Sequence, residues 1–177
     1  MPNLVLGSGI KAVEASGNIT VSATTGWAAH SDTQYTEVSP FSLVGGADWV
    51  NLPNNSGSVD DEFKPSDITA LFDSGKVTGI NGETRGLTLS FAVKPTTGTS
   101  PTIRVKIDIG GAIGEIKDYT RAILFDKGNG VEDRYLSSFI AYTRDTWEAN
   151  GGQWMIKSSS NCDIYNIRTL VAALTRV

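Results

Sequence analysis

Two neighbouring segments of the chain alternate strictly between apolar and polar residues. In residues 87–93 and 102–109, every odd-numbered position is apolar, from Leu87 to Val93 and from Ile103 to Ile109. A two-residue period places one side of a β-strand in a core and the other side in water. The connector between the segments contains Pro95, Gly98 and Pro101, which is typical of a turn. The pattern predicts a half-buried antiparallel pair of strands.

Further strand patterns recur along the chain at short, regular spacing, with turn-forming residues between them. We count roughly eight to ten strands, as in a sandwich or jelly roll. The additional candidates are residues 18–24, 37–44, 49–52, 76–80, 113–125, 131–143, 153–157 and 164–171. Neither a helix–strand alternation nor an internal repeat is visible, which disfavours a doubly wound α/β fold, a solenoid and a propeller.

The predicted fold class is therefore all-β, a single-domain jelly-roll-like β-sandwich of antiparallel strands. Residues 1–24 are expected to form an N-terminal arm or first strand, and residues 25–177 the sandwich. Within the sandwich, the polar residues 25–37 are expected to form a surface loop, and residues 66–72 are the one short helical candidate. The dipeptide Asn81-Gly82 favours a type I′ turn.

Composition and charge exclude several classes of protein. The chain has 177 residues, of which 40% are hydrophobic and 19% charged, and its formal net charge is -4. It is long enough to bury a core without disulfides. Because no cluster of Lys and Arg is present, a nucleic-acid partner is not expected. No run of apolar residues is long enough for a membrane-spanning helix, and the first residues lack the charged region of a secretory signal.

The chain contains few of the residues that carry catalysis. Cys162 is the single cysteine, so it cannot form a disulfide within the chain, and we expect it to be buried as a small apolar residue. His30 is the single histidine, and we expect it at the surface or in an interface. A serine nucleophile needs an oriented base, and zinc needs several His or Cys ligands. We therefore predict no catalytic residue, no metal and no cofactor.

Carboxylates and glycines have simpler interpretations. Residues 59–63 form the densest acidic cluster, but they lack the alternating pattern of a calcium loop, so we expect a solvated acidic stretch. A glycosidase needs two carboxyl groups across a cleft, and nothing in the sequence places Asp108 opposite Asp118. The glycines after the strand-like runs are expected to form tight turns at the corners of the sandwich. They are Gly110, Gly111, Gly128, Gly130, Gly151 and Gly152.

Two tryptophans in the last third of the chain have two interpretations. Trp147 and Trp154 could form a platform on which a sugar stacks. The alternative, which we favour, places Trp154 in the core and Trp147 at a corner or in a subunit interface.

From residue 37 to the end, the order of strands and corners resembles a known group of proteins. The residues that carry the resemblance are 91–95, 108–111, a charged stretch through Arg121, 125–128, 142–152 and 164–167. They are similar to the jelly-roll modules of tailed-bacteriophage structural proteins, which occur as capsid decoration (cement) proteins and in head or tail fibres. The architecture of these modules is similar to that of trimeric tumour-necrosis-factor-like jelly rolls. The resemblance implies a non-enzymatic, oligomeric virion component with no shared catalytic residues.

On this basis we expect a capsid decoration protein on the outer surface of the virion. Its partners would be the major capsid protein and further copies of itself in a homotrimer, with neither nucleic acid nor a membrane among them. Residues 1–24 would clamp neighbouring capsid subunits. The candidate interface residues are Leu4, Val5, Leu6, Ile10, Trp27 and Tyr35.

Two alternatives remain open from the sequence. The chain could be a tail or fibre component that binds a host-surface receptor or glycan, with Trp147, Trp154, Tyr35 and Trp27 as candidate contacts. It could also be a polysaccharide-acting enzyme built on a jelly roll. The enzyme would require a cleft with paired carboxylates, which a structure can reveal.

Overall fold

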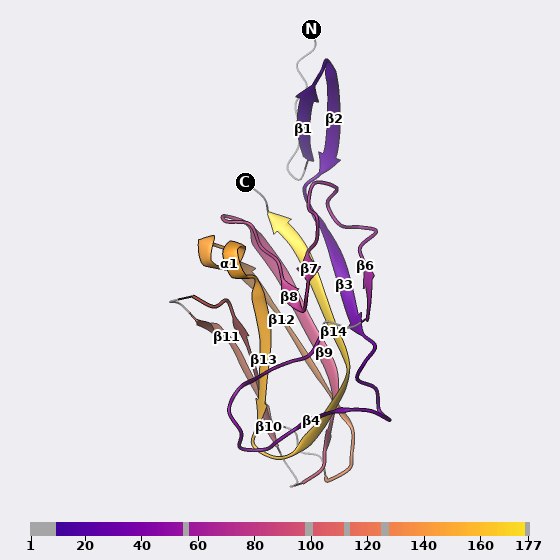
Figure 1. Cartoon of the computed structure of the whole chain (residues 1–177), viewed down its shortest axis with the longest axis vertical. Helices are drawn as coiled ribbons and strands as arrows, with labels where there is room; N and C mark the ends of the chain where they lie inside the picture. Colours follow the sequence, from indigo (N-terminus) through magenta and orange to yellow (C-terminus); the bar gives the residue numbers. More distant parts are fainter. Residues whose placement is uncertain (1–9, 55–56, 98–100, 112–113, 125–127, 176–177) are drawn as a thin grey trace.

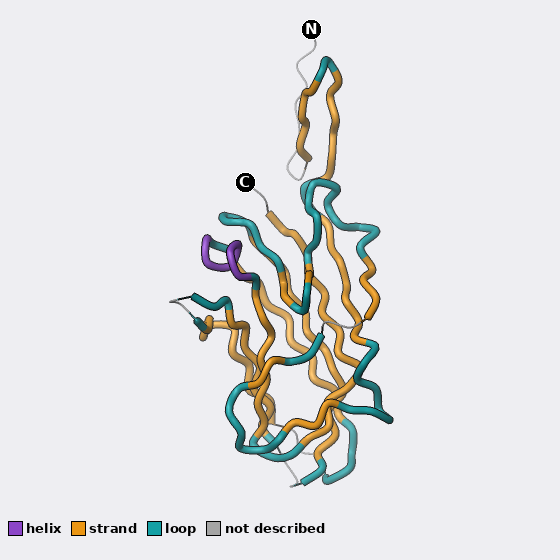
Figure 2. Tube along the Cα trace, in the orientation of Figure 1, coloured by secondary structure: helices purple, strands orange, loops and turns teal. Residues whose placement is uncertain are grey.

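The computed structural model describes residues 10–54, 57–97, 101–111, 114–124 and 128–175. These residues form two antiparallel sheets that make a β-sandwich, and a separate two-stranded hairpin that extends from one end of it (Figure 1). Strand dominates the trace, and helix is confined to one short segment (Figure 2). The predicted all-β, jelly-roll-like sandwich is confirmed.

The hairpin consists of β1 (Ile10–Ala15) and β2 (Asn18–Ala23), which pair only with each other among the described strands. Ser16 and Gly17 connect them, with φ values of 53° and 77°. Two consecutive residues with positive φ make a type I′ turn, whose twist matches that of the flanking strands.

The first sheet, called sheet I below, has the strand order β11-β10-β13-β8-β7, and β5 pairs with β13 beside this path. Its short strands β7 and β8 are joined by Ser74 and Gly75, which also have positive φ and form a second type I′ turn. The strands are β5 (Val50–Asn51), β7 (Phe72–Asp73), β8 (Lys76–Val77), β10 (Thr102–Asp108), β11 (Glu115–Leu124) and β13 (Gly152–Ser158).

The second sheet, called sheet II, has the order β12-β9-β14-β3-β6, and β4 pairs with β14. Its centre is the long β14, which pairs with β9 on one side and with β3 and β4 on the other. The strands are β3 (Gly26–Asp32), β4 (Phe41–Leu43), β6 (Gly57–Asp60), β9 (Thr84–Pro95), β12 (Asp133–Tyr142) and β14 (Cys162–Thr175).

The core lies between the sheets and contains the two alternating segments. Their odd-numbered side chains are buried, as predicted: Leu87, Leu89, Phe91, Val93, Ile103, Val105, Ile107 and Ile109. The predicted pairing of these segments is wrong, however, because β9 belongs to sheet II and β10 to sheet I. Alternation determines which side of a strand is buried, but not which strand lies beside it. The connector therefore crosses from one sheet to the other.

Residues 26–32 form a strand, so the predicted surface loop at residues 25–37 is wrong over most of its length. β3 lies between β14 and β6, and its Ala28 and Ala29 are 2% and 3% exposed. His30 is 5% exposed, so it does not lie at the surface, which was one of the two places predicted for it. The segment contains few large apolar residues, and its burial comes from neighbouring strands that are distant in sequence.

The predicted helix at residues 66–72 is also wrong, because this segment consists of turns that lead into β7. The one helix among the described residues is α1 (Asp145–Asn150), where the sequence indicated only a turn. Asn81-Gly82 lies in a turn, but only Gly82 has positive φ, at 86°. A type I′ turn requires positive φ at both central residues, so this prediction is not met.

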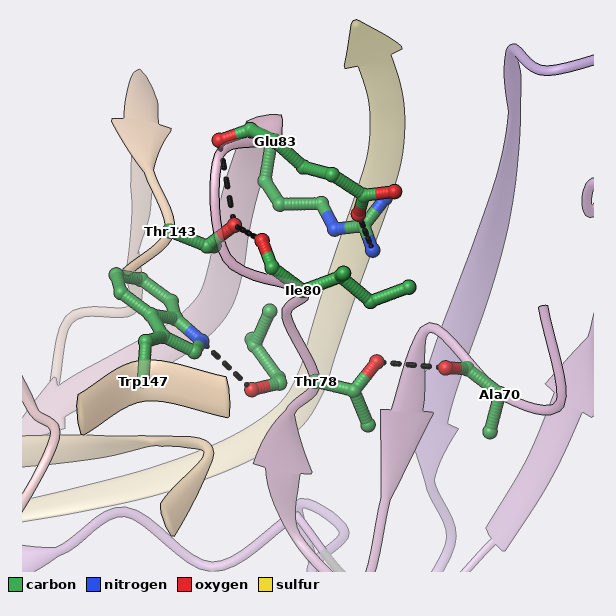
Figure 3. Close-up of polar contacts among 8 residues, drawn as sticks. Ala70, Thr78, Ile80, Glu83, Thr143 and Trp147 are labelled. Carbon is green, nitrogen blue, oxygen red and sulfur yellow. Dashed lines mark hydrogen bonds and ion pairs between the residues drawn. The ribbon is translucent and has the colours of Figure 1, made fainter. Parts of the chain in front are cut away.

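A network of polar contacts links the connection between β8 and β9 to α1 and to the residue that follows β12 (Figure 3). The indole Nε1 of Trp147 donates to the carbonyl of Val77 at 3.0 Å. The hydroxyl of Thr143 lies within hydrogen-bond distance of the Ile80 and Glu83 carbonyls. Next to it, the Glu83 carboxylate and the Arg85 guanidinium form a buried ion pair at 2.5 Å.

Candidate interaction surfaces

The hairpin presents an apolar face to solvent. In its register, Ala12 is opposite Val21 and Glu14 is opposite Ile19, so these residues share one side with Ile10. Ile10, Ile19 and Val21 are 46%, 58% and 55% exposed. The exposed Glu14 lies on the same side. We call the four apolar residues Ile10, Ala12, Ile19 and Val21 the hairpin face.

Of the six residues predicted at an interface, the three that the structure describes do not converge on one surface. Ile10 lies on the hairpin face, whereas Trp27 is half-buried in β3 with its ring stacked on that of Phe63 at 5.2 Å. Tyr35 is half-buried beyond the end of β3 and packs edge-on against Phe41 at 5.5 Å. Leu4, Val5 and Leu6 lie outside the described residues.

Trp147 and Trp154 are in the core, each with 1% of its surface exposed. Trp154 packs edge-on against Phe139 at 5.5 Å, and Trp147 is fixed by its hydrogen bond to Val77. Neither ring has a face open to a sugar, so their assignment as glycan contacts is wrong. Trp154 lies in the core, as the favoured interpretation of the sequence predicted. Trp147, which belongs to α1, also lies in the core.

The outer face of sheet II carries an apolar hollow. A cavity of about 350 Å³ opens over β9, β12 and β14, where Gly86 is opposite Ile140 on one side and Ala172 on the other. This space is open because glycine has no side chain and the side chain of alanine is a single methyl group. Beside the hollow, the edge strand β12 exposes Leu136, Ile140 and Tyr142. We call this region the sheet II hollow.

The outer face of sheet I is cationic around one tryptophan. Three positive groups surround the ring of Trp49: Lys106 Nζ at 4.4 Å from its centroid, Lys157 Nζ at 4.9 Å and Arg104 Cζ at 5.5 Å. No pattern in the sequence predicts this cluster. The alternation in residues 102–109 points Arg104 and Lys106 outward, but only the strand register places Lys157 and Trp49 beside them.

Two polar cavities lie further along the same sheet. One, of about 370 Å³, is lined by residues that include Gln34, Tyr35 and Asn54, and the other, of about 280 Å³, by residues that include Lys76 and Asp108. Asn51 and Gln153 line both cavities, so the two adjoin.

The buried titratable groups are engaged in structural contacts. His30 Nδ1 lies 2.6 Å from Oδ1 of Asn54, whose amide nitrogen donates to the Thr169 hydroxyl at 2.6 Å. The His30 ring also stacks on Phe72 at 4.6 Å. Cys162 is 1% exposed, as predicted, and burial raises the pKa of its thiol above 9.0. A raised thiol pKa suppresses the nucleophilic thiolate at neutral pH.

The acidic stretch at residues 59–63 is exposed, as the sequence predicted. Within it, Asp61 Oδ2 lies 3.9 Å from Nζ of Lys64. The side chain of Asp118, the predicted counterpart of Asp108, lies outside the described part of the chain. Among the described residues, no group of three or more His, Cys, Asp or Glu side chains could hold a metal ion. Nor is any helix in the described part long and apolar enough to cross a membrane.

Comparison with known proteins finds likeness in structure alone. No protein-family model and no curated protein sequence matches the chain. The vertex protein P5 of PRD1 is similar to it with a TM-score of 0.51 and 10% identity, over 98% of this chain and 86% of that chain. Eiger TNF from S. frugiperda gives a TM-score of 0.51 and 8% identity, over 86% of this chain and 93% of that chain.

A third structure, VP2 of the infectious bursal disease virus subviral particle, has a TM-score of 0.45 and 11% identity. That alignment covers 98% of this chain and 37% of the other. At identities this low, the two likenesses with a TM-score of 0.51 show that the fold is a jelly-roll-type sandwich.

Proposed function

We propose that the chain is a non-enzymatic virion structural protein that decorates the outer surface of a capsid and stabilises the shell. The fold it shares with the PRD1 vertex protein supports this proposal. The observation that carries it is the hairpin, which projects from the sandwich (Figure 1) and exposes the hairpin face.

A projecting hairpin with an apolar face needs a partner for physical reasons. An isolated two-stranded hairpin is at best marginally stable in water, because one pair of strands buries little apolar surface. Each apolar side chain that a partner covers contributes on the order of 1–2 kcal/mol, at about 25 cal/mol per Å². Docking on a capsid subunit would therefore order the hairpin and attach the sandwich to the shell.

The test is addition of the purified protein to particles that lack it, followed by cosedimentation and thermal challenge of the particles. We expect Val21→Asp, which places a charge on the hairpin face, to abolish binding and the added heat resistance. Val13→Asp is the matched control, because Val13 is 48% exposed on the opposite side of the same hairpin. Equal binding by both variants, or particles that are equally heat-resistant without the protein, would contradict the proposal.

The same proposal includes association of the chain with itself, as a homotrimer. The sheet II hollow supports this, because it lies beside the exposed Leu136, Ile140 and Tyr142 of β12. We expect side chains from the edge of one copy to enter the hollow of the next, and a repeated contact of this kind closes into a ring when the rotation between neighbouring copies allows it.

Light scattering coupled to gel filtration tests this association. Ala172→Arg fills the hollow with a charged side chain, and we expect it to yield monomers. Val38→Arg, at a residue that is 94% exposed on a loop, is expected to leave the oligomer unchanged. A monomeric wild-type protein would contradict the trimer without affecting the capsid-binding proposal. The tail or fibre alternative predicts labelling of tails instead of heads when antibody-labelled particles are imaged.

A further inference from the structure

Two short strands share one edge of β13, and the strand ladder is interrupted between them. β5 and β8 both pair with β13 on the side away from β10, one after the other. The backbone N–H of Leu52 donates to the carbonyl of Trp154 at 2.8 Å, after which the chain leaves this edge and returns to it at Lys76. Pro53 and Gly75 lie on the two sides of the interruption, and both line the cavity of about 370 Å³. The cavity is therefore located where the ladder is broken.

The turn after β3 contributes a second wall to this cavity, and one carboxylate fixes its shape. Asp32 Oδ1 accepts hydrogen bonds from the backbone N–H groups of Gln34 and Tyr35, each at 2.9 Å. An Asp that bonds to the backbone two residues ahead stabilises a turn. The Tyr35 ring is also held in place, because it packs edge-on against Phe41. Gln34 and Tyr35 thus line the cavity in positions that are set without a ligand, which lowers the cost of binding.

Side-chain amides are the commonest polar groups that line this cavity and the adjoining one of about 280 Å³. The amides of Gln34 and Asn51 belong to exposed residues and make no hydrogen bond within the described part of the chain. Among the same residues, Gln153 and Asn150 use only the amide nitrogen, each in a bond to a backbone carbonyl, at 3.0 and 2.9 Å. All four amides therefore retain donors or acceptors for a ligand.

The smaller cavity also contains one charge of each sign. Lys76 and Asp108 line it, and they lie on either side of Gln153 in the register of the sheet. Lys76 Nζ donates to the carbonyl of Asn150 at 3.0 Å, and Asp108 Oδ1 accepts from the backbone N–H of Gly110 at 2.7 Å. The two charges cancel, and both groups are already bonded to the backbone.

Two further carboxylates lie beside the cavities. Asp73 is directly opposite Lys76 on β7 and accepts a hydrogen bond from the Ser74 hydroxyl at 3.1 Å, and Asp32 holds the turn after β3. Carboxylates therefore outnumber the lysine in this region, which disfavours an anionic ligand. Because all of these charged groups bond to the protein itself, the groups that remain for a ligand are mainly the neutral amides.

We propose that the two adjoining cavities form one groove, called the amide groove, which binds a neutral oligosaccharide. Gln34 lines its larger part and Asn150 its smaller part, and Asn51 and Gln153 line both. Each amide donates and accepts hydrogen bonds, and so does each sugar hydroxyl, so the two match along the groove. With cavities of about 370 and 280 Å³, the groove is in the size range of small-molecule sites, roughly 300–1,000 Å³.

The apolar residues in the lining disfavour a peptide as the ligand. Peptides and proteins bind most firmly where an apolar or aromatic side chain fills a desolvated pocket. Leu52 and Ile109 line the groove, but they are 0% and 5% exposed and belong to the core. The amide groove therefore offers such an anchor little apolar surface, whereas sugar hydroxyls require none.

The proposal is tested by calorimetric titration of the whole chain with four neutral sugars: maltohexaose, mannohexaose, xylohexaose and N-acetylchitohexaose. We expect binding of at least one sugar, and Gln34→Ala combined with Asn51→Ala should weaken it by about tenfold, because two sets of hydrogen bonds are lost. Asn81→Ala combined with Asn129→Ala removes two exposed amides outside the groove and should leave binding unchanged. Absence of binding to all four sugars, or equal weakening by both pairs, would overturn the proposal.

Thermal unfolding without sugar separates a binding role of the amides from a structural one. Both double variants are expected to have the Tm of the wild-type protein, because none of the four amides is bonded to another described residue. A lower Tm for Gln34→Ala with Asn51→Ala alone would mean that these amides hold the fold together, and the proposal would fail. Val21→Asp in the hairpin should bind the sugar as the wild type does, so this proposal and capsid binding can fail independently.

Salt and two further ligands identify the chemistry that the groove recognises. Binding of a neutral sugar should be unchanged when NaCl is raised from about 0.05 to about 0.5 M, because no charge is paired. Hexagalacturonate, which adds carboxylates to the sugar rings, should bind no more tightly than the neutral sugar. A neutral peptide of five Gly-Ser repeats should not bind. Loss of affinity with salt, tighter binding of hexagalacturonate, or equal binding of the peptide would each contradict a site for neutral sugars.

Discussion

The hydroxyl of Tyr165 donates a hydrogen bond of 2.6 Å to Oε2 of Glu132, and so links β14 to the residue before β12. Burial of the phenol, followed by this bond to a carboxylate, raises the pKa of Tyr165 above its ordinary value of 10.0. Burial also raises the pKa of Cys162. In both cases, folding favours the protonated group.

These two shifts predict that the protein loses stability in alkali. Below the ordinary pKa values of Tyr and Cys, the contribution of the two groups to stability is fully present. Above these values, the folded state binds more protons than the unfolded state. The free energy of unfolding therefore falls as pH rises. The decrease is at most about 1.4 kcal/mol per pH unit for each group. Denaturant unfolding between neutral and alkaline pH measures it. Tyr165→Phe should flatten the curve above about pH 10, and an unchanged slope would contradict this assignment.

The ion pair of Glu83 and Arg85 predicts a large effect of a small substitution. Both side chains are buried, at 2% and 0% exposed. Glu83→Gln removes the negative charge of this pair from beside the buried guanidinium, which should cost about 3–5 kcal/mol of the free energy of unfolding. Asp61→Asn breaks the exposed pair with Lys64 and should cost less than about 1 kcal/mol. Similar losses for the two variants in urea unfolding would show that Arg85 does not depend on Glu83.

Substitution of Trp147 distinguishes a core residue from a ligand-binding one. Trp147→Phe removes the donor to the Val77 carbonyl and leaves a small void, so we expect a loss of about 2–4 kcal/mol in stability. Val38→Ala alters an apolar residue that is 94% exposed on a loop and should change stability by about 0.5 kcal/mol or less. If Trp147→Phe leaves the denaturation midpoint unchanged, the place of α1 against the core is wrong.

Gly152 is required by the close packing of the same indole. A Cβ atom at Gly152 would lie 2.7 Å from Cζ2 of Trp147 and 2.9 Å from Cγ2 of Ile107, both of which are buried. Gly152→Ala should therefore destabilise the protein by about 1–3 kcal/mol through overpacking. At Gly128 the nearest atom to a Cβ is 3.9 Å away, so Gly128→Ala should be tolerated. Calorimetric Tm values of the two variants measure the difference, and equal values would contradict the packing described here.

Local patterns in the sequence predict much of the architecture. The alternation of residues 87–93 and 102–109 determined which side chains of β9 and β10 enter the core, because a strand turns successive residues to opposite sides. The composition likewise restricts the possible chemistry, because one His and one Cys are too few ligands for most zinc sites.

The partners of each strand were decided only by the tertiary structure. Pairing of β9 and β10 with each other would satisfy the same alternation, but the core needs their apolar sides to face one another from different sheets. In the same way, β3 is a strand because β14 and β6 supply its hydrogen bonds, although its own residues are mostly small or polar.

The same distinction between local sequence patterns and tertiary contacts applies to the candidate sites. Sequence indicated residues with suitable chemistry, such as Trp147 and Trp154, but burial removed both from the surface. The cluster of Trp49, Arg104 and Lys157 combines residues from three segments, and only the register of β5, β10 and β13 brings them together. Local sequence determined the side on which each side chain points, because that depends on the backbone of one strand. Contacts between strands distant in sequence determined the surfaces, because they depend on how the whole chain packs.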